Sequence, residues 1–351
     1  MTKMTIGEVI RKYRKQKGMT QEEMATILGV TTPAVNKWER GNTMPDVALL
    51  APIARLLSIS TDELLSYKDN LTDEEINQYL HIVQEDLKNK DFHDVFLSVK
   101  KKIEEFPNSE KLIWQLAIIL DSKLMVSDIR DKDNYENTIL KWYERCLDSE
   151  DERIRKEAAD SLFHAYIRKE NYDKAAHYLE YFSFDNPERK RKKALINSKT
   201  GKRTEAYRSY EELLYTGYQQ MQLVLNDLRL LYMEDDDYEM AKKLVEVSSS
   251  IASAFEMGKY NEVCIALDVA AWKKDVEWTA HIMREILESV DTISDFAYSK
   301  LYRHMKLKSV APSFIADVKK ELLKSLNDET FDYMNGNEEW EKLKKDTYEK
   351  E

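Results

Sequence analysis

Residues 20–41 decide the fold of the N-terminal part of the chain, and they read TQEEMATILGVTTPAVNKWERG. Thr20 is followed three residues later by Glu23, which is the capping box that opens a helix. Gly29 supplies the positive φ that a tight turn requires after that helix. Pro33 suits the first turn of a second helix, where a missing N–H costs nothing. The segment is therefore predicted to be two short helices joined by a turn.

The flanking sequence extends this pair to a module of five helices. Residues 6–17 form an amphipathic pattern with apolar side chains on one face. Residues 46–57 follow Pro45 with a second apolar stripe, and Ser60 with Glu63 forms another capping box. We therefore expect a small all-α N-terminal domain, residues 1–66.

These residues resemble the lambda-repressor-like, or XRE, family of bacterial and phage regulators. The family's glutamine at the head of the first motif helix is Gln21, and its Trp-Glu-x-Gly ending is Trp38-Glu39-Arg40-Gly41. The resemblance covers about residues 5–66 and implies a helix-turn-helix that binds double-stranded DNA.

The resemblance also implies roles for individual residues. Gln21 would place a helix N-terminus against a phosphate, Asn36 suits adenine, and Lys37 suits guanine. Pro33 departs from the usual polar residue and allows apolar contact only. Arg14 and Glu39 match a pair that forms a structural salt bridge in this family. The expected DNA-contacting residues are Gln21, Thr31, Thr32, Pro33, Asn36, Lys37, Arg40 and Asn42.

Charge is distributed unevenly along the chain. The first 70 residues carry a net charge of +2 and the rest carries −13, which gives −11 in total. An acidic remainder repels DNA, so we expect only the N-terminal end to touch it. The strongest basic run outside that end, residues 189–193, is interpreted as a solvated helix start, with contact to DNA or an acidic partner as the alternative.

The amino-acid composition indicates a helical protein without a membrane-spanning segment. The chain has 351 residues with only 8 Gly and 6 Pro, and 34% of its residues are charged, as in a helical protein. It contains no stretch of 18 apolar residues and no apolar signal core, so we expect a cytoplasmic protein without membrane contact. Cys146 and Cys264 are expected to be reduced core thiols.

Catalytic motifs are absent from the sequence. It has no Gly-rich phosphate loop, no His-Glu-x-x-His and no Gly-x-Ser-x-Gly, and its six histidines lack metal-ligand spacing. We therefore expect no enzyme, no catalytic or metal-binding residue and no cofactor.

The remainder of the chain, residues 73–351, follows a short linker at residues 67–72 and shows repeated helix-turn-helix patterns. Its clearest unit, residues 154–187, has small residues at a helix crossing, an aromatic near the turn and a proline expected at its end. Later turns are predicted at Lys202, Asp236 and Asp275, which follow the turn at Asp173 at successive intervals of 29, 34 and 39 residues. This resembles the tetratricopeptide pattern, and we predict a degenerate solenoid of about five or six helix pairs.

The combination of this N-terminal domain with a tetratricopeptide-like body is similar to the peptide-pheromone-responsive RRNPP regulators. The resemblance implies a body that forms a homodimer and grips a short signalling peptide with asparagine side chains. A carboxamide offers both a donor and an acceptor to a peptide main chain. The candidate ligand-binding residues are Asn197, Asn226 and Asn261, which precede their turns by offsets that share one helical face.

The sequence therefore predicts a sequence-specific DNA-binding transcriptional regulator. One recognition helix reads only a few base pairs, so a homodimer with two half-sites is expected. The repeats would serve dimerisation and the sensing of a peptide or protein. Two alternatives stay open, namely a body that only dimerises or docks a partner protein, and an interaction scaffold with a vestigial DNA-binding domain.

Overall fold

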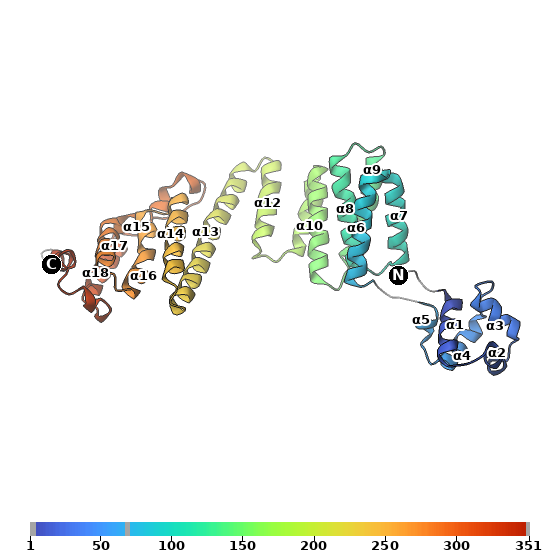
Figure 1. Cartoon of the computed structure of the whole chain (residues 1–351). Coiled ribbons are helices and arrows are strands. Elements are labelled where there is room, and N and C mark those ends of the chain that lie inside the picture. The colour runs from blue at the N-terminus through green and yellow to red at the C-terminus, as the bar shows by residue number, and fades with distance from the viewer. Residues whose placement is uncertain (1–4, 67–70, 349–351) are drawn as a thin grey trace. The chain divides into compact units, whose positions relative to one another are not determined.

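Helices account for all the regular secondary structure of the computed structural model, which describes residues 5–66 and 71–348 (Figure 1). We call residues 5–66 the head and residues 71–348 the body. The predicted linker, residues 67–72, lies outside the described residues except for Leu71 and Thr72. The all-α fold with a helix-turn-helix followed by helical repeats is confirmed.

The head consists of five helices around one apolar core. Ile10, Met24, Val35 and Ile53 are fully buried in that core. Gly7 lies where the first and third helices cross, because a Cβ there would stand 2.0 Å from the carbonyl oxygen of Trp38. The five helices are α1 (Ile6–Gln16), α2 (Gln21–Leu28), α3 (Thr32–Glu39), α4 (Val47–Leu57) and α5 (Thr61–Leu64).

The chain divides into two compact units, Met1–Leu162 and Phe163–Glu351. The body part of the first unit is built from antiparallel helix pairs whose apolar faces pack together. Buried residues such as Val99 and Leu116 form its core. Its helices are α6 (Asp73–Asn89), α7 (Phe92–Glu105), α8 (Glu110–Val126) and α9 (Lys132–Cys146), and α10 (Glu152–Arg168) leads into the second unit.

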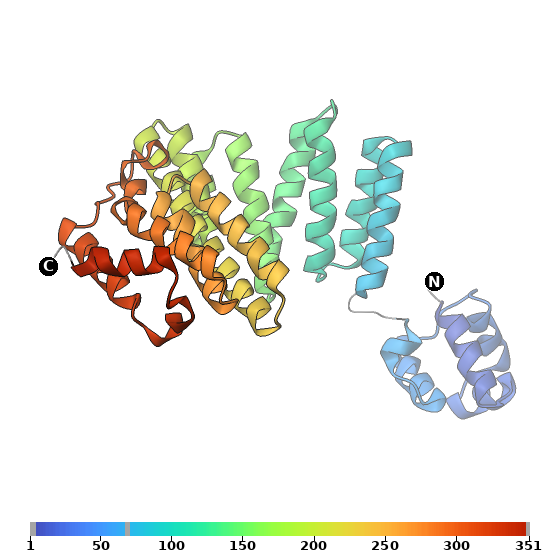
Figure 2. The same cartoon turned by 60° about the vertical axis from the view of Figure 1, so that its left-hand side comes forward.

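The second unit continues with helices that pack side by side, coloured from yellow-green to orange in Figure 2. Shorter helical segments close its C-terminal end. Its longer elements are α12 (Pro187–Lys199), α13 (Arg203–Glu234), α14 (Tyr238–Ala254), α17 (Val276–Ser289), α18 (Pro312–Ser325) and α19 (Glu338–Tyr348). The short ones are α11 (Tyr172–His177), η1 (Tyr178–Tyr181), α15 (Lys259–Val263), η2 (Cys264–Ala266), α16 (Leu267–Trp272), η3 (Val290–Thr292), η4 (Asp295–Tyr298), η5 (Lys300–Tyr302) and η6 (Glu329–Met334).

The structure departs from the predicted repeat in one long element. The interval between the turns near residues 202 and 236 was expected to hold a helix pair, but α13 is one uninterrupted helix of 32 residues. The interval contains no proline and no turn sequence. Its one interior glycine, Gly217, costs about 1 kcal/mol relative to alanine, which does not break a helix of this length.

Two smaller predictions about the repeat are wrong. Pro187 does not end a helix; it begins α12, because the first turn of a helix needs no N–H from that residue and Asn186 caps it. The basic run at residues 189–193 is not wholly solvated. Lys192 is 1% exposed, and its ammonium lies 4.9 Å from the ring centre of Phe163 and 5.3 Å from that of Phe182. Cation–π contacts favour the burial of this side chain.

Candidate DNA interface and candidate ligand groove

The helix-turn-helix of the head forms as its local sequence requires. The Thr20 hydroxyl accepts a hydrogen bond from the N–H of Glu23 at 3.1 Å, and the Glu23 carboxylate accepts one from the N–H of Thr20 at 2.7 Å. This box starts α2, and Gly29 ends it with a φ of +69°. A residue without Cβ adopts that conformation without strain, so the chain turns directly into α3.

Thr31 lies at the N-cap of α3, but within the described head its side chain makes no capping hydrogen bond. A capping side chain normally accepts from the second or third N–H of the helix. The second residue is Pro33, which has no N–H, and the third, Ala34, donates to the Thr31 carbonyl at 2.9 Å instead. Thr31 therefore occupies the N-cap position without capping the helix through its side chain.

A buried ion pair holds α1 against the end of α3. The guanidinium of Arg14 donates to the carboxylate of Glu39 at 2.5 and 3.0 Å, and it also donates to the carbonyl of Met19 at 2.6 Å. Burial by itself would raise the pKa of Glu39, but hydrogen bonds from Arg14 and Gln21 outweigh it and lower that pKa below its ordinary value. The salt bridge that the sequence resemblance implied is present.

The same carboxylate is joined to two candidate DNA-contacting residues. Gln21 donates to Glu39 at 2.8 Å, and Asn36 donates to Gln21 at 3.1 Å. Gln21 and Asn36 are half-buried, whereas the other six candidates are exposed. Pattern reasoning missed this connection, because residues 15 and 18 positions apart meet only after the two helices cross. The network holds the side chains of Gln21 and Asn36 in defined orientations.

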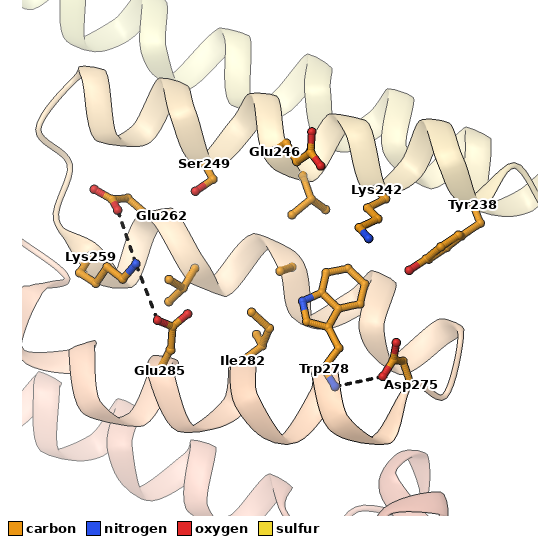
Figure 3. Close-up of a pocket in the computed structure, with 13 residues that line it drawn as sticks. Tyr238, Lys242, Glu246, Ser249, Lys259, Glu262, Asp275, Trp278, Ile282 and Glu285 are labelled. Carbon is orange, nitrogen blue, oxygen red and sulfur yellow. Dashed lines mark hydrogen bonds and ion pairs between the residues drawn. The ribbon is translucent and has the colours of Figure 1, made fainter.

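The second candidate site is a groove of about 480 Å³ in the second unit, between α14, α15 and α17 (Figure 3). The ammonium of Lys259 lies 3.9 Å from the carboxylates of both Glu262 and Glu285. The ammonium of Lys242 lies 5.8 Å from the ring centre of Trp278, which faces it across the groove. The lining is Tyr238, Lys242, Val245, Glu246, Ser249, Lys259, Glu262, Val263, Ala266, Asp275, Trp278, Ile282 and Glu285.

This lining is acidic and partly aromatic. It holds four carboxylates against two ammonium groups, so its formal charge is −2. The two ion pairs of Lys259 are longer than direct hydrogen bonds. No single stretch of sequence indicates the groove, because its walls come from three separate helices.

The three asparagines predicted to bind a ligand lie on α12, α13 and α15. Asn226 accepts a hydrogen bond from Arg229 at 2.7 Å. Asn261 donates to the carbonyls of Met257 and Ile293 at 2.6 and 3.1 Å. None of the three, Asn197 included, is among the described residues that line the groove.

The cysteines are both free, and Cys146 is buried. Burial raises the pKa of Cys146 to about 12 and that of Cys264 to about 11, so both are thiols at neutral pH. Over residues 5–66 and 71–348, the structure brings together no group of three His, Cys, Asp or Glu side chains that could hold a metal ion. No helix within the same ranges has both the length and the apolar character needed to cross a membrane.

Comparison with known proteins finds similarity to the head in sequence. The family described as "Helix-turn-helix" matches residues 10–64. The uncharacterized HTH-type transcriptional regulator YazB of Bacillus subtilis is 45% identical over 58 residues, which are 16% of this chain and 84% of YazB. YqaE, another such regulator of Bacillus subtilis, is 42% identical over 64 residues, 18% of this chain. The chain spans only 55% of the length of YqaE.

Solved structures align along most of the chain, but weakly. The crystal structure of Bacillus thuringiensis PlcR with the peptide PapR7 and DNA is 16% identical and has a TM-score of 0.26; the alignment covers 91% of this chain and 98% of PlcR. The SHP pheromone receptor Rgg2 of Streptococcus dysgalactiae is 14% identical with a TM-score of 0.23, over 91% of this chain and 100% of Rgg2.

Proposed function

Because the chain belongs to the helix-turn-helix transcriptional regulators through its head, we propose that the head binds double-stranded DNA in a sequence-specific way and that the body controls this binding. The observation that carries the proposal is the network from Glu39 through Gln21 to Asn36. The network orients the carboxamide of Asn36 on α3, and the exposed Lys37 is the next residue in the sequence.

The proposed contacts divide into two classes. Thr32, Pro33, Asn36 and Lys37 would face base edges, where Asn pairs with adenine and Lys with guanine. The N-terminus of α2 at Gln21, together with Thr31, Arg40 and Asn42, would contact phosphates, which position the protein without reading sequence.

Selection from a library of random DNA duplexes by the full chain tests this proposal. We expect enrichment of one sequence, present as two half-sites because the active form is a homodimer. Lys37→Ala and Asn36→Ala should change the enriched bases, whereas Arg40→Ala should weaken binding to all sequences alike. Failure of the full chain to enrich any sequence would contradict the proposal.

For the body we propose that the groove binds a short peptide segment with a positive charge, either free or at the end of a partner protein. Its four carboxylates favour a cation, and Trp278 offers a face against which a cationic or aromatic side chain packs. Asn197, Asn226 and Asn261 stay a separate prediction, to be tested by Asn→Ala variants.

Calorimetric titration of the full chain with basic and acidic peptides of equal length tests the groove. We expect the basic set to bind more tightly and Glu262→Gln with Glu285→Gln to weaken that binding. Glu288→Gln serves as the control, because Glu288 is exposed on α17, the helix of Glu285, but does not line the groove. Equal affinity for both peptide sets would overturn the assignment.

A further inference from the structure

Helix α13 exposes a continuous row of large apolar side chains. Its members are Tyr207, Tyr210, Leu214, Met221, Val224, Leu228 and Leu231, which are between 38% and 64% exposed. They follow one another at alternating intervals of three and four once Gly217, also exposed, is counted among them. This is the spacing of a coiled-coil seam, and it runs for about 36 Å.

Glycine is unfavourable in the middle of a helix. Nothing described within this chain requires a glycine at position 217. It has no positive φ. A Cβ built on it meets no described atom within 4 Å outside the backbone of its own helix. A glycine at the centre of an apolar row suits the close approach of another chain.

The row is complementary to itself when a second copy runs antiparallel to it. A two-fold axis at Gln219 sets Gly217 against Met221 of the partner subunit, so that the smallest member meets a long one. The same axis sets Leu214 against the partner's Val224. This is the isologous arrangement of a symmetric dimer, in which one patch contacts its own copy.

The N-terminal end of the row is hollowed, and the C-terminal end carries exposed leucines. A hollow of about 260 Å³ lies at the N-terminal end, lined by Tyr207, Tyr210 and their neighbours on α12 and α13. Leu228 and Leu231 lie at the C-terminal end, where they are 38% and 53% exposed. Antiparallel pairing places the partner's Leu231 opposite Tyr207 and the partner's Leu228 opposite Tyr210, so two apolar side chains of each copy lie over the hollow of the other.

Charges at the two ends point to the same orientation. Lys202 and Arg203 stand at the start of α13, and Glu234 and Asp235 stand at its end, all of them exposed. The helix dipole favours the opposite arrangement, so the helix itself does not account for these positions. In the antiparallel pair, Arg203 lies opposite the partner's Asp235, with attraction at both ends.

From these observations the geometry points to α13 as the dimer interface, with a second copy of this chain packed antiparallel along the row from Tyr207 to Leu231. This interface would join two heads so that they can bind two DNA half-sites, and that role rests on the proposed function. The pairing itself does not require DNA.

Sedimentation of the full chain tests the interface. We expect a dimer at micromolar concentration, and we expect Met221→Lys or Leu228→Lys to raise its dissociation constant on the order of 100-fold, because a lysine in the seam is buried without a partner. Leu223→Lys is the matched control, since Leu223 is 57% exposed on the same helix but lies outside the row. A wild-type monomer, or a dimer unaffected by both seam variants, would overturn the inference.

Gly217→Leu separates loss of pairing from loss of folding. Leucine is a far better helix former than glycine, and a Cβ at this position meets no described atom of its own chain beyond the helix backbone. We therefore expect this variant to melt at no lower temperature than the monomeric Met221→Lys chain and yet to fail to dimerise. A variant that still dimerises like the wild type would show that no partner side chain lies over Gly217.

Disulfide trapping tests the orientation. Leu214→Cys combined with Val224→Cys should give a covalent dimer on a non-reducing gel, because the antiparallel pair brings the two positions together. Within one chain they are about 15 Å apart, which is beyond the reach of a disulfide. Equal cross-linking by Leu214→Cys alone would indicate a parallel pair and overturn the antiparallel assignment.

DNA binding measured in parallel distinguishes the two proposals. Lys37→Ala should stay dimeric while its base preference changes, and Met221→Lys should keep the base preference of a half-site while losing affinity for two half-sites. If the wild type pairs through α13 but enriches no DNA sequence, the proposed function fails and the interface stands. If it enriches DNA but does not pair through α13, the interface alone fails.

Discussion

The side chain of Asn36 donates a hydrogen bond of 3.1 Å to Gln21, which ties the recognition helix to the first residue of the helix before it. Gln21 in turn donates to Glu39 in the head's buried ion pair. The surface proposed to contact bases is therefore anchored to the core of its domain. Such support holds a binding side chain in one orientation before the partner arrives.

Gln21→Ala removes the middle of this network. We expect a loss of stability of about 1 kcal/mol in the head. DNA affinity should fall roughly tenfold, about 1.4 kcal/mol, because a phosphate contact and the orientation of Asn36 are lost together. Fluorescence anisotropy with a labelled duplex measures the affinity. Gln16→Ala, an exposed change on α1, should bind as the wild type does, and an unchanged affinity for Gln21→Ala would refute the anchoring role.

Glu39→Leu leaves the Arg14 guanidinium buried without its partner. Removal of one member of a buried pair costs about 3–5 kcal/mol, enough to unfold a small domain. The methyl NMR signal of Met24, which is fully buried in the head, should then take its unfolded position while the body stays folded. Arg14→Met combined with Glu39→Leu should restore part of the stability, since no lone charge remains; a double variant worse than the single one would argue against this account.

The head should also lose stability in acid because of Glu39. The pKa of this carboxyl is lowered from its ordinary value of 4.5 in the folded head. Such a group stabilises the fold at pH above its unfolded pKa, and this stabilisation disappears as the pH falls through the folded pKa. We expect denaturant titrations that follow Met24 to show falling stability below about pH 4.5. The loss in this window should be smaller in the variant that carries both Arg14→Met and Glu39→Leu.

Lys192→Ala should destabilise the second unit of the body. The ammonium of Lys192 lies over the rings of Phe163 and Phe182, and its side chain is almost fully buried. Loss of these contacts and of the packed stem should cost about 2 kcal/mol or more. Urea denaturation followed by circular dichroism gives the change. Lys193→Ala is the matched control, because the neighbouring Lys193 is exposed.

The head could be predicted almost entirely from sequence, because its start and stop signals are local. Thr20 and Glu23 bond to each other's backbone, and Gly29 takes the positive φ that its position requires. The body was less predictable, because local signals do not decide how its helices pack. Turn positions at residues 201–202 and 235–237 were indicated by local composition, yet whether the interval between them bends depends on packing that spacing does not record.

The candidate sites divide in the same way. The helix-turn-helix residues share a short segment, so a motif identifies them together. The groove between α14, α15 and α17 combines Trp278 with Glu246 and Glu262, and no periodic pattern links these positions. The three asparagines share offsets from predicted turns, but Asn226 accepts a hydrogen bond from Arg229 and Asn261 donates to main-chain carbonyls of its own chain. A carboxamide that could bind a peptide main chain can equally form hydrogen bonds within its own fold.

The length of α13 has a mechanical consequence. An unbroken helix of 32 residues is a stiff rod about 48 Å long. If such a rod tilts by about 5° around one end, its other end moves by about 4 Å, which is roughly three-quarters of the rise of one helical turn. Helices α12 and α14 both pack on this rod, so a small change in the angle of either packing contact would produce a larger displacement at the far end of α13.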